Sequence, residues 1–357
     1  MKKTALVFGM ILAAGVTFAQ PVLKSASSVN EYSLVYELYG GTNAASNKES
    51  YTENATVTLA DPSRSGYTFK GWYWDEGLKN PVAANTFSNR KGALKVYAKW
   101  QKNMDFATYE SEYMVEIIPG DMKVTLEDFA GTSGPQDIFG YSIGKYEVTQ
   151  ELYMAVTGTN PSRFNGEKRP VEMVTWYDAV NFCNELTKMV MGAENCCYTI
   201  TSIRKNEYGA IESANVIWDQ SKKGYRLPTE AEWEMAARGG VKGGWEYMYS
   251  GSDNIDDVAW YCENSPKDEN WNSMTSNVGT KNANMAGLYD MSGNVWEWCW
   301  NQPSSGSSER VFRGGGYSNR VYRGGSYYDD HCAVSYNNSY NPHYRYDYLG
   351  FRVCRGL

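Results

Sequence analysis

Only two stretches between residues 114 and 357 have apolar residues at helical spacing. Residues 175–190 form the first, with Thr175 placed as an N-cap, and residues 229–240 form the second. In the second stretch Thr229 and Glu232 have the spacing of a capping box, and Gly239 follows as a stop signal. The remainder alternates short β-forming runs with Gly- and Asn-rich loops. A region of this length with so little helix predicts one irregular α+β domain.

The first 19 residues are typical of a secretory signal peptide. Two lysines precede an apolar run, and the small residues Thr17 and Ala19 follow it as a candidate cleavage site. This run is short for a bilayer span, and no longer apolar run occurs elsewhere. We therefore expect an exported chain without a transmembrane segment, located at the cell surface, in the periplasm or secreted. Residues 20–30 are predicted to be a polar linker.

Charge and cysteine spacing exclude two further classes of protein. The formal net charge is −7 and no basic stripe is present, which argues against a nucleic-acid partner. The seven cysteines have no paired C-x-x-C spacing, so a zinc site is not expected. Export permits disulfides, and Cys332–Cys354 is the pair we predict; buried thiols are the alternative.

Residues 31–101 read as a small strand-rich domain. The segments 39–42 (YGGT), 66–73 (GYTFKGWY) and 96–100 (VYAKW) resemble the internalin-type B repeat. That resemblance implies a β-grasp-like spacer or adhesive module without catalytic activity. A helix within residues 76–90 is an open alternative to strands there. Residues 102–113 are predicted to be a second linker.

Seven phrases occur in order along residues 114–357. They lie at residues 144–150, 160–162, 169–176, 226–234, 287–298, 323–326 and 350–352. Together they resemble the formylglycine-generating enzyme (sulfatase-modifying factor) family. The resemblance implies that family's version of the C-type lectin fold. It does not by itself imply the family's activity.

The catalytic thiols of that family are missing at the matching positions. The resemblance places the family's thiol pair at Asp329 and Val334, and neither residue is a cysteine. Cys332 lies between them, but one sulfur cannot supply a pair that binds copper. The sequence therefore predicts a protein that is not an enzyme of this kind.

The same resemblance implies one structural calcium ion and no other cofactor. Its ligands would be side-chain or backbone oxygens of Asp290, Gly293, Val295 and Glu297. In the alternative interpretation the two carboxylates cap a turn and pair with arginine.

The C-terminal tract has an unusual composition. Residues 310–357 contain no Lys, Glu, Gln, Met or Trp, and Tyr, Asn, Asp, His and Ser dominate between Tyr327 and Tyr348. Codons that end in a pyrimidine cannot encode the five missing types. Changes at the adenines of an Asn codon reach all of the abundant ones. The tract therefore looks like Asn codons that were diversified at their adenines.

This pattern resembles the variable proteins of diversity-generating retroelements, particularly those of treponemal type. Such proteins display a diversified segment on a C-type lectin scaffold, and the variable segment here would be about residues 310–348. Tyr and small polar residues suit a recognition surface, because Tyr gives contact area at low entropic cost. The ligand expected is a protein or glycan, on another cell.

The candidate contact residues are the tyrosines and polar residues of the tract. They are Tyr317, Ser318, Asn319, Tyr327, Tyr328, Asp329, Asp330, His331, Ser335, Tyr336, Asn337, Asn338, Ser339, Tyr340, Asn341, His343, Tyr344, Tyr346, Asp347 and Tyr348. Asp347 is expected at the rim. The tandem segments 310–319 and 320–329 predict an extra contact loop at 317–319, or only a doubled strand start. The alternatives for the tract are a disordered tail and an ordinary structural loop. The alternatives for the protein are an oxidase related to the parent family and a fixed structural or adhesion protein of the envelope.

Overall fold

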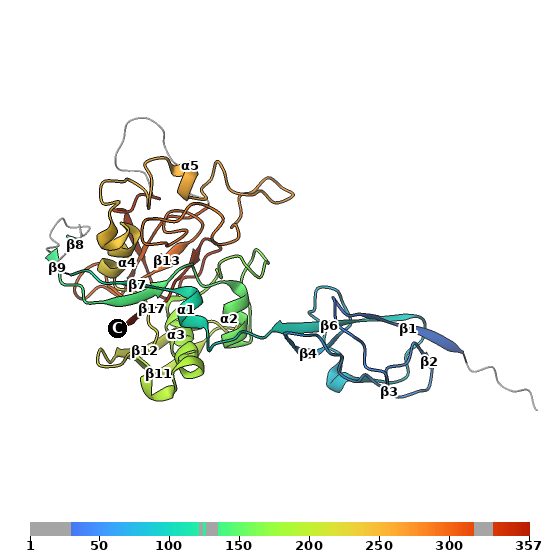
Figure 1. Ribbon diagram of the computed structural model, residues 1–357. Coiled ribbons are helices and arrows are strands. Elements are labelled where there is room, and N and C mark those ends of the chain that lie inside the picture. The colour runs from blue at the N-terminus through green and yellow to red at the C-terminus, as the bar shows by residue number, and fades with distance from the viewer. Residues whose placement is uncertain (1–29, 121–123, 126–134, 318–330) are drawn as a thin grey trace, which may run out of the picture. The chain divides into compact units, whose positions relative to one another are not determined.

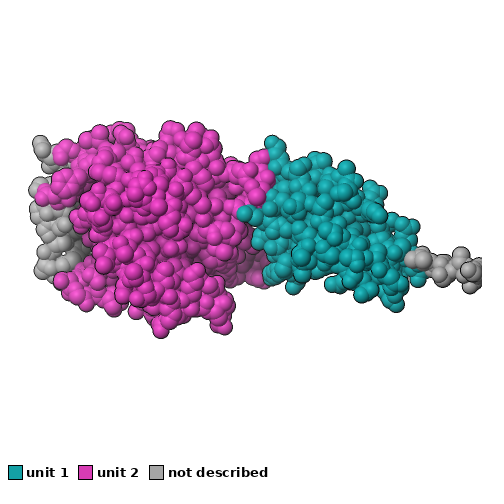
Figure 2. Space-filling model, turned by 90° about the horizontal axis from the view of Figure 1, so that it is seen from below, with its two compact units in different colours: residues 1–65, 69–100 teal, residues 66–68, 101–357 magenta. Residues whose placement is uncertain are grey.

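A computed structural model describes residues 30–120, 124–125, 135–317 and 331–357. Contacts divide the chain into two compact units, which Figures 1 and 2 show. The smaller unit comprises residues 1–65 and 69–100, and the larger comprises residues 66–68 and 101–357. None of the helices in the described ranges is long and apolar enough to cross a membrane.

The smaller unit is built on a four-stranded sheet with the order β2-β1-β6-β4, beside a β3-β5 pair. Its strands are β1 (Glu31–Glu37), β2 (Ser50–Thr52), β3 (Val57–Thr58), β4 (Tyr67–Tyr73), β5 (Thr86–Phe87) and β6 (Leu94–Lys102). Trp72 is fully buried at its centre, and the indole N–H donates to the carbonyl oxygen of Ala60 at 3.2 Å. Within 76–90 the one helical segment is a 3-10 turn, η1 (Ala83–Asn85), so the longer helix that we left open there is not formed.

The larger unit contains five α-helices among the residues described. They are α1 (Tyr109–Tyr113), α2 (Gln150–Thr157), α3 (Trp176–Val190), α4 (Glu230–Ala237) and α5 (Ile255–Val258), with 3-10 turns η2 (Ala193–Asn195) and η3 (Gly240–Lys242). The strands are β7 (Met114–Ile117), β8 (Val124–Thr125), β9 (Pro135–Gln136), β10 (Tyr141–Gly144), β11 (Tyr198–Lys205), β12 (Ile211–Trp218), β13 (Trp296–Trp298), β14 (Arg310–Arg313), β15 (Asn337–Tyr340), β16 (Leu349–Gly350) and β17 (Cys354–Gly356).

Both predicted helices begin at their predicted caps. The Thr175 hydroxyl accepts from the Asp178 N–H at 3.0 Å, and the Asp178 carboxylate accepts from the Thr175 N–H at 3.1 Å. Thr229 and Glu232 form the same reciprocal box at the start of α4. These bonds satisfy donors that a helix start leaves without a partner.

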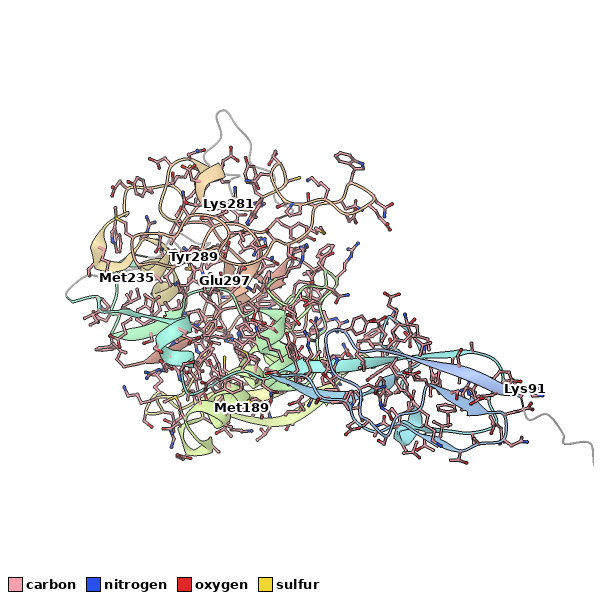
Figure 3. All side chains as sticks on the ribbon, turned by 45° about the vertical axis from the view of Figure 1, so that its right-hand side comes forward. Lys91, Met189, Met235, Lys281, Tyr289 and Glu297 are labelled. Atoms are coloured by element: carbon pink, nitrogen blue, oxygen red, sulfur yellow. The ribbon has the colours of Figure 1, made fainter. Side chains whose placement is uncertain are left out.

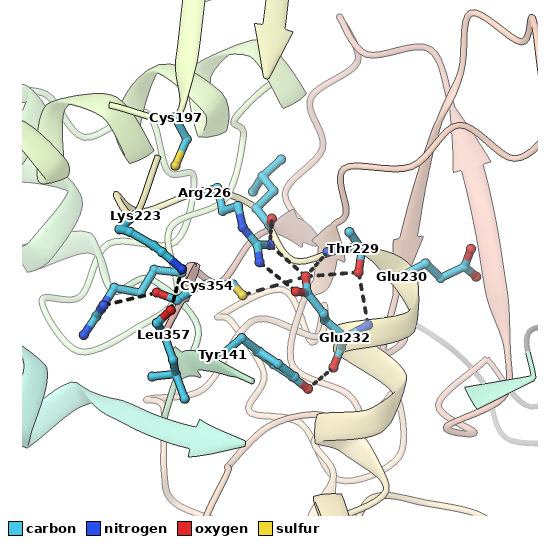
Figure 4. A network of polar contacts seen from close by, with 12 residues as sticks. Tyr141, Cys197, Lys223, Arg226, Thr229, Glu230, Glu232, Cys354 and Leu357 are labelled. Atoms are coloured by element: carbon cyan, nitrogen blue, oxygen red, sulfur yellow. Dashed lines mark hydrogen bonds and ion pairs between the residues drawn. The ribbon is translucent and has the colours of Figure 1, made fainter. Parts of the chain in front are cut away.

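Helix α4 is buried on all sides, and three glutamates lie within it. Each carboxylate has a guanidinium partner, as buried charges require. Glu232 forms a two-point pair with Arg226 at 2.6 and 2.7 Å, which Figure 4 shows beside Tyr141 and Cys354. Glu230 and Glu234 both pair with Arg313 from strand β14. Salt bridges therefore fix α4 against the C-terminal strands.

Two sheets carry the end of the chain into the interior. The three-stranded sheet has the order β17-β10-β7, and the four-stranded sheet has the order β15-β14-β13-β16. Strands β16 and β17, at the end of the chain, belong to different sheets. Arg352 lies between them and is fully buried.

The segment predicted as the second linker belongs partly to the core of the larger unit. Tyr109 in α1 is buried, stacks on Tyr113 and meets Tyr225 edge to face at 5.5 Å. The main core is apolar and aromatic, with Trp176, Phe182, Trp298 and Phe351 among its buried members.

Candidate binding surface

Strand β15, which lies within the described part of the tract, pairs with strand β14. The two strands are antiparallel, with Arg313 opposite Asn337 and Arg310 opposite Tyr340. On its other side β14 pairs with β13, which in turn pairs with β16. Strand β15 is thus the edge strand of a sheet whose inner strands are buried.

One face of β15 is tied to helix α4. The Asn337 amide donates to Glu230 at 2.7 Å, and the same carboxylate pairs with Arg313 at 2.7 Å. Arg313 is 1% exposed and also donates to the carbonyl oxygen of Val334. Ser339 donates to Glu309 at 2.5 Å. Asn337 and Ser339, both predicted as contact residues, are therefore bonded to the scaffold.

The other face carries a row of tyrosines. We call Tyr336, Tyr340, Tyr344, Tyr346 and Tyr348 the tyrosine cluster. Tyr340 stacks on Phe312 with ring centroids 5.6 Å apart, and Tyr346 stacks on Tyr348 at 4.9 Å. Tyr344 lies 5.6 Å from Tyr340 and 5.8 Å from Tyr346. Tyr340 and Tyr344 are exposed, whereas the other three are half-buried against the core.

The two histidines extend the aromatic surface at either end. His331 lies 4.6 Å from Tyr336, and both rings lie 6.0 Å from buried Trp296. His343 is exposed and lies 4.7 Å from Tyr344. Ser335 is exposed, and Asn338 and Asn341 are half-buried. Seven of the fourteen described candidate residues, the two histidines and the tyrosine cluster, thus take part in these ring contacts.

Asp347 and Tyr317 have structural partners. Arg163 forms a salt bridge with Asp347. Tyr317 is 4% exposed, contacts Phe164 edge to face, and its backbone N–H donates to the carbonyl oxygen of Asn294 at 2.8 Å. Burial raises the pKa of the Tyr317 hydroxyl, followed in effect by the charge of Asp347. Our prediction of Tyr317 as a surface contact is therefore wrong; the residue braces the tract from inside.

Six candidate residues lie outside the described residues: Ser318, Asn319, Tyr327, Tyr328, Asp329 and Asp330. The first family thiol position, Asp329, is among them. The second, Val334, is buried in the core beside α4.

The predicted disulfide is not formed. Cys332 and Cys354 are buried in different apolar clusters, so the pairing that we predicted for them is wrong. Burial in apolar surroundings raises the pKa of the Cys354 thiol well above its ordinary value.

The predicted calcium ligands divide into two kinds. Asp290 is buried, and its Oδ2 accepts from the Gly279 N–H at 2.7 Å; Oδ1 has no hydrogen-bond partner among the described residues. Burial raises the pKa of Asp290 to about 6. Glu297, in contrast, forms a two-point pair with Arg352 and also accepts from the indole of Trp233.

The Glu297 carboxylate therefore does not fit the role of calcium ligand, because both oxygens have partners. Arginine pairing, which we left open, holds for this residue. Figure 3 labels Glu297, which is fully buried, and Tyr289, which is half-buried. Gly293 and Val295 lie in the same buried loop, and the Val295 N–H donates to Glu147 at 3.0 Å. Calcium at Asp290 stays a prediction.

Sequence reasoning missed the residues that support the surface. Arg163 and Glu230 lie far from the tract in sequence, whereas Phe312 and Arg313 lie in strand β14 at the start of the tract. Each contacts a candidate contact residue. The segment RVFR (310–313) does not alternate apolar and charged side chains, so it gave no signal for which face meets α4.

Fold and surface define a C-type lectin domain of the formylglycine-generating-enzyme type. Residues 100–357 match the family described as "Sulfatase-modifying factor enzyme 1-like domain", and the chain belongs to this family. Residues 32–99 match the "Listeria-Bacteroides repeat domain". Both matches confirm the resemblances found in the sequence.

Three similar proteins illustrate the range of the family. "Chaperone protein LppX" of Paenibacillus barcinonensis is 42% identical over 231 residues, which are 59% of this chain and 75% of that protein. "Inactive C-alpha-formylglycine-generating enzyme 2" of Bos taurus is 33% identical over 152 residues, 40% of this chain and 49% of that protein. The structure of "Treponema denticola variable protein 1" is 35% identical, with a TM-score of 0.54, and covers 68% of this chain and 95% of that one. The chain spans about half the length of the bovine relative.

Proposed function

We propose that this chain is an exported, non-catalytic binding protein that recognises its ligand through the tyrosine cluster and the neighbouring tract residues. The proposal rests on one observation: some residues of the tract are bonded to the scaffold or buried, and others are exposed. Asn337 and Ser339 bond to the scaffold and Tyr317 is buried, while Tyr340 and Tyr344 of the tyrosine cluster are exposed. Rigid, amphipathic tyrosines on a fixed frame are typical of recognition surfaces.

The similarity to a treponemal variable protein supports a diversified tract. Likewise, Val334 at a family thiol position, and a relative whose name contains "inactive", support the absence of formylglycine-generating activity. The ligand class is a protein or glycan of another cell. The N-terminal repeat would act as a spacer or adhesive module, and the apolar leader supports export.

A retargeting experiment tests the proposed role of the surface. A library randomises Tyr336, Tyr340, Tyr344 and Tyr346 in the full mature chain and is selected for binding to hen lysozyme as a defined protein target. We expect folded binders with melting temperatures close to that of the parent. A control library of equal size randomises exposed residues of the β11–β12 hairpin, Thr199, Thr201, Ile203 and Ile217. Failure of the tract library to give folded binders, or equal success of the control, would reject the proposal.

Two further measurements separate the alternatives. Sequencing downstream of the gene should find a near-copy of the tract with adenines at the differing positions, beside a reverse transcriptase. Incubation with a cysteine-containing sulfatase peptide, copper and oxygen should leave the cysteine unchanged. Formation of the aldehyde would establish the oxidase instead.

A further inference from the structure

A cavity of about 480 Å³ lies among α2, α3 and the β11–β12 hairpin. The hairpin packs against α3, and both elements appear near α2 in Figure 1. One residue of the tract, Arg345, also lines the cavity. The volume is within the range of small-molecule sites in proteins, about 300–1,000 Å³.

Arg345 is held in the cavity wall by an aromatic residue of the hairpin. Its guanidinium carbon lies 5.0 Å from the ring centroid of Tyr208, which is 73% exposed at the hairpin turn. Stacking fixes the plane of a guanidinium and leaves its N–H edge able to donate. A guanidinium in this state is suited to bind a carboxylate at two points.

The cavity wall carries two cations, Lys205 and Arg345, and two carboxylates, Asp178 and Glu185. Neither cation lies within ion-pair distance of a carboxylate in the described part of the chain. Glu185 is already paired with Lys188 at 2.7 Å. Asp178 lies near enough to Arg345 to interact electrostatically.

The Asp178 carboxylate is itself bound within the fold. Its Oδ1 accepts from the Ile211 N–H at 2.9 Å, and its Oδ2 accepts from the Thr175 N–H at 3.1 Å. These are the bonds of the helix cap and the hairpin start. An entering anion would meet two cations that form no short ion pair with a carboxylate in the described residues. The two wall carboxylates already accept from partners within the fold, Asp178 from two backbone N–H groups and Glu185 from Lys188.

The remaining lining suits a hydroxylated ring. Asn181 and Thr159 add neutral donors and acceptors, while Val156 and Ile211 give an apolar base. Sugars present such a mixture, with apolar ring faces and hydroxyl groups at the edges. We infer that this cavity is a second ligand site, independent of the tyrosine cluster, which binds an acidic sugar through its carboxylate at Arg345 and Lys205.

D-glucuronate is the probe for this site, in calorimetric titrations of the full mature chain. D-glucose tests the need for the carboxylate, acetate tests the need for the ring, and inorganic phosphate tests whether any anion suffices. We expect glucuronate to bind more tightly than each of the three. Arg345→Ala and Lys205→Ala should each weaken binding by about tenfold or more, the loss of a charge-assisted bond. Lys222→Ala removes an exposed lysine outside the cavity and should have no effect.

Three results would overturn the inference: no detectable glucuronate binding, equal binding of acetate or phosphate, or unchanged binding in Arg345→Ala. Circular dichroism on each variant checks that the fold is kept. Tyr336→Ser and Tyr340→Ser should leave glucuronate binding unchanged. These two variants separate the second site from the tract surface, so either proposal can fail without the other.

Discussion

The guanidinium of Arg352 donates two hydrogen bonds to the carboxylate of Glu297, from Nε to Oε2 at 2.6 Å and from Nη2 to Oε1 at 2.7 Å. Both side chains are fully buried. Arg352 also donates to the carbonyl oxygens of Gly144 and Tyr289, each at 2.9 Å. One side chain thus joins the ends of β10 and β16 to the loop before β13. Glu297 lies in β13, so the pair anchors the sheet that contains β14 and β15.

Removing one partner of this pair should be costly. Arg352→Met leaves a buried carboxylate without its counter-charge, and we expect a loss of about 3–5 kcal/mol in the free energy of unfolding. The double variant Arg352→Met with Glu297→Gln should lose less than the sum of the single changes, because neither charge is then left alone. Urea unfolding measures all three. Additive losses would show that the two residues act independently.

Replacing Asn337 by aspartate should lower the stability of the protein. Asn337→Asp places a second carboxylate against Glu230, 2.7 Å from the present amide nitrogen. We expect a loss of about 1–3 kcal/mol at neutral pH. Like charges raise the pKa of such a pair, so the loss should shrink as the pH falls and one carboxylate takes up a proton. Asn338→Asp, on the opposite face of β15, is the matched control. Equal destabilisation of both variants would argue against the contact.

Glu172 should make stability fall as the pH rises. Burial raises the pKa of this carboxyl to about 7, against which the N–H groups of Arg163 and Phe164 act. The folded state then holds a proton that the unfolded state releases near pH 4.5. Its stabilising contribution is complete below about pH 4.5 and is lost as the pH rises through about 7. Glu172→Gln should therefore gain stability relative to the parent over this window, by about 1–3 kcal/mol.

Thermal unfolding at several pH values between 4 and 8 measures this difference. Glu167→Gln replaces an exposed glutamate nearby and should run parallel to the parent at every pH. A difference between the Glu172→Gln variant and the parent that does not change with pH would contradict the assigned protonation.

Calcium should stabilise the protein through Asp290. Its unpartnered Oδ1 lies in a buried region with Glu147, whose pKa burial raises well above normal, helped by the charges of Asp290 and Glu297. A hard cation with oxygen ligands would offset this excess of negative charge. Added calcium should raise the melting temperature by a few degrees, a chelator should reverse the effect, and Asp290→Asn should abolish it. The same rise in Asp290→Asn would place the cation elsewhere.

Local signals in the sequence predicted part of this structure well. Thr175 and Thr229 cap their helices because a capping box is made within four residues and needs no distant partner. The family motifs also predicted the fold class, because their order can be read directly from the sequence. Predictions that depended on distant contacts fared worse. Tyr109 was assigned to a linker, yet Tyr225 buries it.

The tract shows the same limit. Tyr317 is of a residue type typical of contact surfaces, and only its burial and its contact with Phe164 reveal a structural role. Glu297 was a reasonable calcium ligand until Arg352 was placed against it. Composition identified the surface as a whole, but it could not sort outward side chains from inward ones, because both kinds are drawn from the same few amino acids.

The position of β15 at the edge of its sheet affects how many sequence variants of the tract can still fold. An edge strand has one neighbour, so a sequence change there disturbs one set of backbone pairings, while β13 and β14 keep theirs. If the tract is rewritten between generations, most copies would begin from a frame that already folds. The number of different binding specificities would then depend on how many side chains face outward. Few variants would be lost because they fail to fold.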